Sequence, residues 1–157
     1  MGTDLIVRFA GEGGQGQVTA AEGLAQAAAR VGYHVQTYST YPSQIKGGPV
    51  WAQTRISTKP ILHDGDALDI LVVLNREAYD RHVSELRDGG VLVYNAEDFE
   101  LDSNGSAIGM DVDAIARSTG NPLSGAGKKR HPGSFPKWIS HHLGGNRLGV
   151  HAMVSHD

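Results

Sequence analysis

Short apolar runs alternate along the chain with segments in which apolar residues recur at helical spacing. The first run, residues 5–10, is interrupted only by Arg8 and ends at a glycine-rich stretch. Such a run predicts a strand in a sheet that is covered on both faces. Residues 18–31 follow and predict a helix that ends at Gly32. The apolar face of this helix is expected to consist of Val18, Ala21, Leu24, Ala25 and Ala28.

The alternation continues through about the first 120 residues. The most apolar stretch, LDILVVLN at residues 68–75, predicts a central strand. Further strands are expected over residues 33–38, 50–57 and 91–95, and further helices over residues 77–86, ending near Gly89-Gly90, and 111–117. Strand, helix and strand in repetition predict an α/β domain with three layers, α/β/α, and a mostly parallel, Rossmann-like sheet.

Composition limits the class of protein. The chain has 157 residues, of which 39% are hydrophobic and 20% charged, and its formal net charge is −3. These values are typical of one soluble globular domain. It contains no cysteine, so disulfides and cysteine-ligated iron–sulfur clusters cannot form within it. No apolar run approaches the ~18 residues of a membrane span, and no leader pattern precedes the first strand. We expect a cytoplasmic protein whose partners are neither nucleic acids nor membranes.

The glycine-rich stretch GEGGQG, residues 11–16, has the spacing G-x-G-x-x-G and lies between an expected strand and an expected helix. In that position glycines let backbone N–H groups approach a phosphate, and the amino end of the following helix favours negative charge. A purely structural role, in which the glycines allow close packing of helix on strand, stays open as the alternative.

Two common nucleotide sites fit this sequence poorly. An NAD site needs an acidic residue about 20 positions after the glycines to bind the ribose, and no Asp or Glu occurs between Val35 and Leu62. A P-loop needs G-x-x-x-x-G-K-[ST], but Gly120 to Gly125 is followed by Ala126. A phosphate-containing ligand other than NAD is therefore favoured.

A second stretch, TYSTYPSQIKGGPVWAQTRIS at residues 37–57, combines hydroxyls, a proline turn and a glycine pair between two expected strands. Loops that follow the carboxyl ends of strands lie on one edge of an α/β sheet, so this loop is expected to face the glycine stretch. Of its two basic residues, we expect Lys46 to serve function and Arg55 to be solvated.

Both stretches, followed by GDALDILVVLNREAYDRHVSELRDGGVLVYN, closely resemble the gamma domain of 2-oxoacid:ferredoxin oxidoreductases over roughly residues 4–117. The GGQG turn, the YPSQIKGG loop and the DILVVLN…GGVLVYN pair carry the resemblance. The segments FAGEGGQG and YHVQTYSTYPSQIKGG are most similar to the amino-terminal gamma region of the fused alpha subunit of 2-oxoglutarate:ferredoxin oxidoreductase. Separate gamma subunits and indolepyruvate enzymes share much of the pattern.

The resemblance implies a component of the oxidative decarboxylation of a 2-oxoacid, most similar to the 2-oxoglutarate type, to its acyl-CoA, with electrons passed to ferredoxin. In this family thiamine diphosphate and iron–sulfur clusters are held by other domains or subunits, the alpha and beta partners. The gamma domain helps to bind coenzyme A and to brace the assembly. Coenzyme A carries a 3′-phosphorylated ADP, which suits a glycine turn that lacks a ribose-binding acid.

Carried over by position, the expected coenzyme A contacts come from the glycine turn and the facing loop: Gly11, Gly13, Gly14, Gln15, Gly16, Tyr41, Ser43, Lys46, Gly47 and Gly48. No residue stands out as a catalytic acid, base or nucleophile. His34, His63 and His82 are expected to be surface or strand-end histidines. The alternative function is a free-standing nucleotide-binding module, which would bind a nucleotide without a thiamine-dependent partner.

The composition changes after Asn121. Residues 1–121 hold 9 Lys and Arg against 16 Asp and Glu, whereas residues 122–157 hold 5 against 1, with five of the eight histidines. We divide the chain into a gamma domain, residues 1–121, and an atypical basic tail that is disordered or results from a reading-frame change. A native basic extension for an acidic partner is the rival. The histidines of the tail are not expected to bind metal, since the adjacent His141 and His142 would diverge on a helix.

Overall fold

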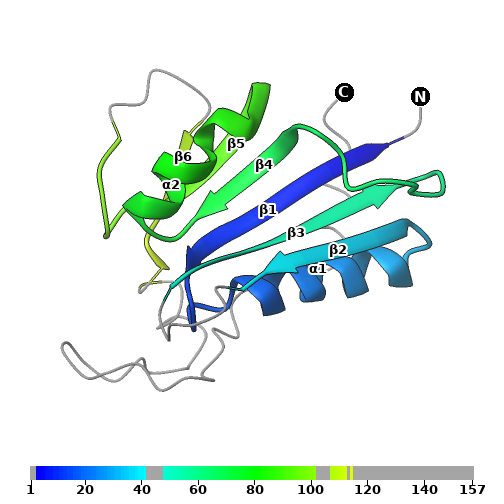
Figure 1. The fold of residues 1–157 in the computed structure, drawn as a ribbon, viewed down its shortest axis with the longest axis horizontal. Coiled ribbons are helices and arrows are strands. Elements are labelled where there is room, and N and C mark those ends of the chain that lie inside the picture. The colour runs from blue at the N-terminus through cyan, green and yellow to red at the C-terminus, as the bar shows by residue number, and fades with distance from the viewer. Residues whose placement is uncertain (1–2, 42–47, 102–106, 113, 115–157) are drawn as a thin grey trace.

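A computed structural model describes residues 3–41, 48–101, 107–112 and 114, which form a six-stranded sheet with two helices (Figure 1). The strand order is β2-β3-β1-β4-β5-β6. In chain order the elements are β1 (Asp4–Glu12), α1 (Gln17–Arg30), β2 (His34–Thr40), β3 (Pro49–Ser57), β4 (Leu68–Val73), α2 (Arg76–His82), a 3-10 turn η1 (Val83–Glu85), β5 (Leu86–Asn95) and β6 (Ala107–Met110).

The sheet is mostly parallel, as expected, apart from β3. Strands β1, β4, β5 and β6 pair in parallel, whereas β3 is antiparallel to both of its neighbours, β1 and β2. Only residues 41–48 separate β2 from β3, and so short a connection suits an antiparallel pair, since a parallel pair needs a crossover of a dozen or more residues. Because β3 reverses between them, β1 and β2 run in the same direction. Their carboxyl ends therefore reach the same edge of the sheet.

Side chains of β1 alternate between two cores. Val7 and Phe9 pack with α1 on one face, and Ile6 and Ala10 pack with Ala78 of α2 on the other. Figure 1 shows the same arrangement, with α1 below the sheet and α2 above it. The expected three-layer α/β/α architecture is confirmed.

Local signals explain where the helices begin and end. Asn75 caps α2, since its side-chain oxygen accepts a hydrogen bond from the Ala78 amide at 2.8 Å. At the carboxyl end of α1, the Gly32 amide donates to the Ala29 carbonyl oxygen at 3.0 Å. Gly32 has a φ of 96°, a conformation that suits glycine at a helix stop. Neither helix of the described residues is long and apolar enough to cross a membrane.

The expected boundaries between α2 and β5 were wrong, and one strand was missed. The helix expected over residues 77–86 is shorter, and β5 already begins at Leu86. Gly89 and Gly90 lie inside β5 rather than after a helix, at an irregularity where the register with β4 shifts. The sequence pattern also missed β6, because its four residues are too few to show an alternation. Of the helix expected over 111–117, residues 112 and 114 are helical and residues 113 and 115–117 lie outside the described residues.

Candidate functional site

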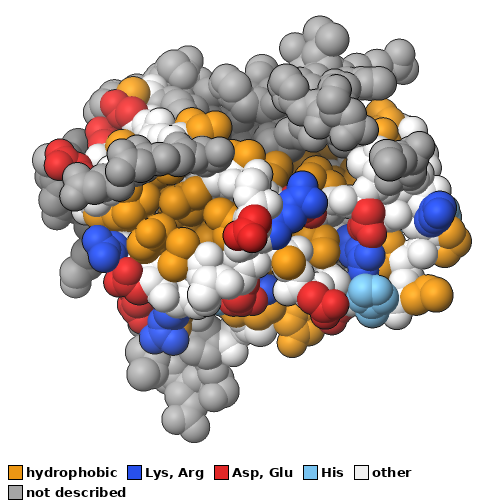
Figure 2. Space-filling view, turned by 90° about the horizontal axis from the view of Figure 1, so that it is seen from above, with side chains coloured by type: hydrophobic (Ala, Val, Ile, Leu, Met, Phe, Trp, Pro, Cys, Tyr) orange, Lys and Arg blue, Asp and Glu red, His pale blue; other side chains and the backbone are white. Residues whose placement is uncertain are grey.

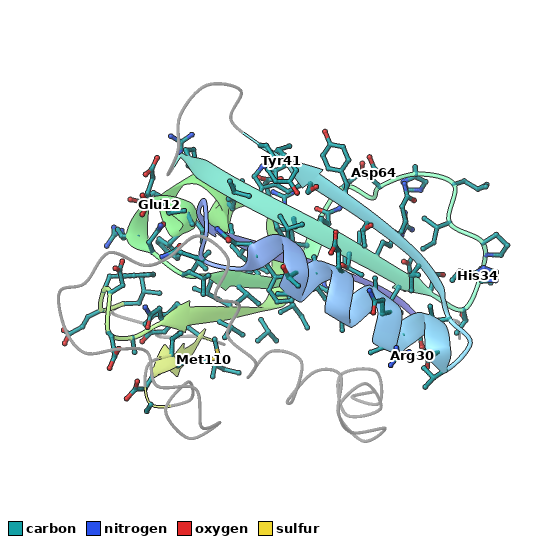
Figure 3. The ribbon with its side chains drawn as sticks, turned by 90° about the horizontal axis from the view of Figure 1, so that it is seen from below. Glu12, Arg30, His34, Tyr41, Asp64 and Met110 are labelled. Carbon is teal, nitrogen blue, oxygen red and sulfur yellow. The ribbon has the colours of Figure 1, made fainter. Side chains whose placement is uncertain are left out.

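The glycine turn and the loop after β2 meet at the carboxyl edge of the sheet. The Gly13 amide donates a hydrogen bond to the Gly48 carbonyl oxygen at 2.9 Å, which joins the two segments directly. In Figure 3 Glu12 and Tyr41 lie toward this end of the molecule, and Arg30 and His34 lie at the opposite end. The expectation that both stretches face one another at one edge is confirmed at these residues.

Two of the glycines in the turn are required for different reasons. A Cβ atom on Gly11 would lie 2.5 Å from the Gln15 side-chain oxygen and 3.1 Å from the Leu74 Cβ, so the site has no room for a side chain. Gly14 has a φ of 95°, which other residues rarely adopt, although a Cβ there would meet open space. Gly11 therefore serves packing, and Gly14 serves the shape of an exposed turn.

Two glutamines hold the turn in place. The Gln15 side-chain oxygen accepts from the Glu12 amide at 2.7 Å, and the buried Gln17 donates its side-chain amide to the Glu12 carbonyl oxygen at 2.7 Å. The side-chain oxygen of Gln15 thus shapes the turn, and a ligand contact by this residue stays a prediction. Gln17 was missed by the sequence pattern, since a polar residue at the start of a helix is ordinarily exposed.

The amino end of α1 offers backbone donors at this edge. Gly16 is the N-cap residue, with a φ of 94°, and has no side chain to accept a hydrogen bond from the helix. The first turn carries no acidic residue. The first N–H groups of a helix have no partner within the helix and, with the helix dipole, favour an anion. A hollow of about 160 Å³ beside the turn has the opposite character, because Glu12 and Glu77 contribute to its lining. A phosphate is therefore better placed on the α1 side of the turn than in this hollow.

Seven of the ten expected contact residues lie within the described part of the chain. Tyr41, directly after β2, has 65% of its surface exposed, and Gly48 accepts the bond from Gly13. The other three expected contacts lie outside the described residues: Ser43, Lys46 and Gly47.

Arg55 is not a solvated surface residue, which corrects the expectation from sequence. Its Nη2 lies 2.5 Å from Asp4 Oδ2, and its Nη1 donates to the His63 carbonyl oxygen at 2.7 Å. The hydrogen bond from Arg55 holds the pKa of Asp4 below its usual value. These residues lie at the opposite edge of the sheet, beside a larger hollow of about 290 Å³, so Arg55 is unavailable to a ligand at the glycine turn.

A second polar cluster lies on the α2 side of the sheet. Arg8 is 7% exposed in the middle of β1, and its guanidinium carbon lies 4.1 Å from the centre of the Trp51 ring. Its Nε and Nη2 both donate to the Gln53 side-chain oxygen, at 3.2 and 2.9 Å, while Nη1 lies 2.6 Å from Glu85 Oε1. The cluster connects β1, β3 and η1. The single signal in the sequence was a charged residue inside an apolar run.

His82 belongs to the same cluster, so its expected place at the surface was wrong. Its Nδ1 lies 3.0 Å from Arg8 Nη1 and 2.9 Å from Glu85 Oε1, and the residue is 9% exposed. Burial raises the pKa of Glu85, but contacts with Arg8 and His82 outweigh it and hold that pKa below its usual value. Each polar side chain of the cluster bonds to at least one other member, which indicates a structural role. Figure 2 shows charges of both signs among apolar side chains on this face.

Comparison with known proteins gives one consistent relationship. The profile of the family described as pyruvate ferredoxin/flavodoxin oxidoreductase matches residues 6–127. The common gamma subunit of the pyruvate and ketoisovalerate oxidoreductases of Thermococcus kodakarensis is 41% identical over 97 residues, which are 59% of this chain and 52% of that subunit. The pyruvate synthase subunit PorC of Methanothermobacter marburgensis is 35% identical over 124 residues, 76% of this chain and 70% of that one.

Solved structures of similar fold point to the same family. The 2-oxoglutarate:ferredoxin oxidoreductase from Magnetococcus marinus, with 2-oxoglutarate, coenzyme A and succinyl-CoA bound, has a TM-score of 0.68 and 35% identity over 74% of this chain and 21% of that chain. The gamma subunit of a keto/oxoacid ferredoxin oxidoreductase from Geobacter sulfurreducens has a TM-score of 0.65 and 25% identity, and the match covers 76% of this chain and 67% of that chain.

The lengths of these proteins differ. The chain spans 52% of the common gamma subunit from Thermococcus kodakarensis and 25% of the ketoisovalerate oxidoreductase subunit VorA from Methanothermobacter marburgensis. The matched region nevertheless includes the glycine turn, the loop after β2 and the strands that position them. This chain belongs to the pyruvate ferredoxin/flavodoxin oxidoreductase family.

Proposed function

We propose that the chain is the gamma component of a 2-oxoacid:ferredoxin oxidoreductase and that its glycine turn contributes to coenzyme A binding. The observation that carries the proposal is the hydrogen bond between Gly13 and Gly48, which brings the glycine turn beside the loop after β2 at the amino end of α1. The complete reaction is the oxidative decarboxylation of a 2-oxoacid to its acyl-CoA, with electrons passed to ferredoxin.

In this proposal the chain binds and positions but does not perform the chemistry. The backbone amides of Gly14, Gly16 and the first turn of α1 hold a phosphate of coenzyme A, because the Gly13 and Gln15 amides already donate to the Gly48 and Glu12 carbonyl oxygens. Tyr41, Ser43 and Lys46 approach the same ligand from the facing loop. Thiamine diphosphate and iron–sulfur clusters belong to the alpha and beta partners, since a chain without cysteine has no thiolate ligand for a cluster. The enzyme is thus active only as the assembled complex.

We further propose 2-oxoglutarate as the 2-oxoacid of that complex. The support is the likeness to the Magnetococcus marinus enzyme at 35% identity, together with the sequences of the glycine turn and of the loop after β2. Several curated relatives are named instead for pyruvate or ketoisovalerate. A substrate panel on the purified complex, with 2-oxoglutarate, pyruvate and ketoisovalerate at equal concentrations, tests the choice. Faster turnover of pyruvate or ketoisovalerate contradicts it.

Co-purification tests the proposal as a whole. The tagged full-length chain, expressed in its source cells, should recover a thiamine-dependent beta chain and a catalytic alpha region, and the recovered material should reduce ferredoxin when given a 2-oxoacid and coenzyme A. A chain that is recovered alone and binds a nucleotide by itself would instead be a free-standing nucleotide-binding module.

A further inference from the structure

The outer edge of β2 is an exposed sheet edge without the usual protection. β2 is the first strand in the sheet order, and in the described part of the chain nothing pairs with its outer side. Its seven residues, HVQTYST, include no Asp, Glu, Lys, Arg or Pro. Natural sheet edges are commonly blunted by charges, by proline or by being very short. At the other end of this sheet, β6 has only four residues, whereas β2 has none of these devices.

The side chains of β2 suit a further strand. Valine, threonine and tyrosine favour extended structure, and the exposed pattern of the strand is that of an open edge. Tyr38, which is 49% exposed, packs against Trp51 of β3 with ring centroids 5.4 Å apart. Gln36 lies on the same face and donates to Asp64 Oδ1 at 2.7 Å. The edge therefore combines free backbone groups with a fixed aromatic ring and a fixed carboxylate.

We propose that a second copy of the chain adds its own β2 to this edge in antiparallel orientation, which joins two six-stranded sheets into one. Side chains on a strand alternate between faces, so a two-fold axis perpendicular to the sheet must pass beside a residue and not between two residues. An axis beside Thr37 uses the whole of β2. It places Thr37 opposite Thr37, Gln36 opposite Tyr38 and Val35 opposite Ser39.

In this register the side chains of the two β2 strands complement one another. Strands without charged residues meet no like-charge repulsion when a strand pairs with its own copy. Tyr38 of one copy comes beside Gln36 of the other, and the phenol comes within reach of the Asp64 carboxylate that Gln36 holds. Each copy therefore supplies one phenol donor and one carboxylate acceptor, so the contact forms twice about the axis. The second copy is thus the occupant that these residues fit.

A charge-swap experiment tests the register with the full-length chain. Sedimentation velocity should give twice the monomer mass of 16.7 kDa for the unmodified chain. Thr37→Lys and Thr37→Glu should each be monomeric, because like charges would lie opposite one another at the axis. Mixing the two variants should restore the dimer. The matched control is Ile108→Lys, an exposed position on the opposite sheet edge, which should stay dimeric.

Covalent trapping gives a second measurement that does not depend on solubility. The chain contains no cysteine, so Thr37→Cys introduces the single thiol. Residues directly opposite in an antiparallel pair have Cβ atoms about 4.5–5.5 Å apart, close enough for a disulfide after a small adjustment. Mild oxidation should yield a cross-linked dimer on a denaturing gel, and Ile108→Cys should yield far less.

Several results would overturn the proposal. These are a monomer at all concentrations without cross-linking, a dimer that Thr37→Lys leaves intact, or a Lys and Glu mixture that stays monomeric. If the chain is monomeric but Thr37→Lys prevents co-purification of another protein, the occupant is a strand of that partner and self-pairing is wrong. The test is independent of coenzyme A, since none of these measurements uses the glycine turn.

Discussion

Nη1 of Arg8 lies 2.6 Å from Oε1 of Glu85, although the two residues belong to the first strand and to the 3-10 turn that precedes β5. Arg8 is buried, and the side chain of Glu85 is 39% exposed, so the pair reaches from the sheet interior to the surface. The same guanidinium packs on Trp51. This contact attaches the α2 and η1 segment to β1 and β3.

Replacing Glu85 by glutamine should destabilise the domain without unfolding it. The substitution keeps the shape of the side chain but removes the charge opposite a buried guanidinium, which retains its bonds to Gln53. We expect a loss of about 1–2 kcal/mol, because Glu85 is partly exposed and solvent screens the pair. Urea unfolding followed by circular dichroism measures this loss. Glu22→Gln, at an exposed position of α1, serves as the charge-matched control.

The contribution of Glu85 to the free energy of unfolding should fall as the pH is lowered. Its pKa is lower in the folded chain than in the unfolded chain, so the unfolded state binds the proton more tightly. The stabilisation is therefore complete above the unfolded pKa of about 4.3 and is lost as the pH falls through the lower, folded pKa. The difference in urea midpoint between the unmodified chain and Glu85→Gln should be largest near pH 7 and shrink below pH 4. A constant difference across this range contradicts the role of the charge.

Substitution of Gly13 should weaken the use of coenzyme A. Gly13 is not among the glycines with positive φ, so its backbone conformation does not by itself exclude a side chain. At the proposed site, a valine here would stand where the phosphate is expected to approach the turn. In the reconstituted complex we expect Gly13→Val to raise the KM for coenzyme A at least tenfold. The KM for the 2-oxoacid should stay the same.

Two controls separate this effect from damage to the fold. The melting temperature of Gly13→Val should stay near that of the unmodified chain, and the bond to the Gly48 carbonyl oxygen should persist, since it uses the backbone amide. Titration of the unmodified chain with NAD should show no binding. An unchanged KM for coenzyme A in a folded variant, or micromolar NAD binding, refutes the assignment of the ligand.

Two glycines far from the turn should respond to alanine in opposite directions. Gly65 has a φ of 88°, and a Cβ there would collide with Ile6 Cδ1, so Gly65→Ala should cost about 2–3 kcal/mol. Gly23 lies within α1, and a Cβ there meets nothing within 4 Å, so Gly23→Ala should stabilise by about 0.5–1 kcal/mol. Thermal unfolding of the two variants measures both. A destabilising Gly23→Ala would mean that α1 is covered at this position.

Truncation after Asn121 tests the division of the chain. On the α1 side of the sheet, Val91 and Val93 of β5 are only partly buried. If residues 122–157 stand in place of a covering helix and result from a frame change, their deletion should leave the melting temperature unchanged, and the amides of β5 should exchange quickly in both chains. Slower exchange in the full chain, or a lower melting temperature after truncation, shows that the tail packs on the domain.

The same truncation also tests the rival interpretation, in which the tail is a native basic arm. A native basic arm predicts that the melting temperature is kept or improved, while binding to an acidic partner weakens in a salt-dependent way. The partner binding of the full and truncated chains should therefore be compared at two salt concentrations. A salt-independent result, or equal binding, contradicts the basic arm.

The sequence by itself determined the layered α/β class, the apolar face of α1, the central position of β4 and the place of the glycine turn before a helix. These features follow from the spacing of apolar residues and from glycine, which act over a few neighbouring positions. Gly11 and Gly14 were identified as turn residues for this reason. The weakest local signals, the four residues of β6 and the end of α2 at His82, were missed or misplaced.

Only the tertiary structure decided the direction of β3, the bond between Gly13 and Gly48 and the burial of Arg8 with Gln53 and His82. Arg8 lies 45 positions from Gln53 and 74 from His82, and no local pattern encodes such a pairing. A charged residue in an apolar run can be solvated at an edge or paired in the interior. Which of these occurs depends on whether other elements bring acceptors to it, since a buried charge without a partner is too costly to persist.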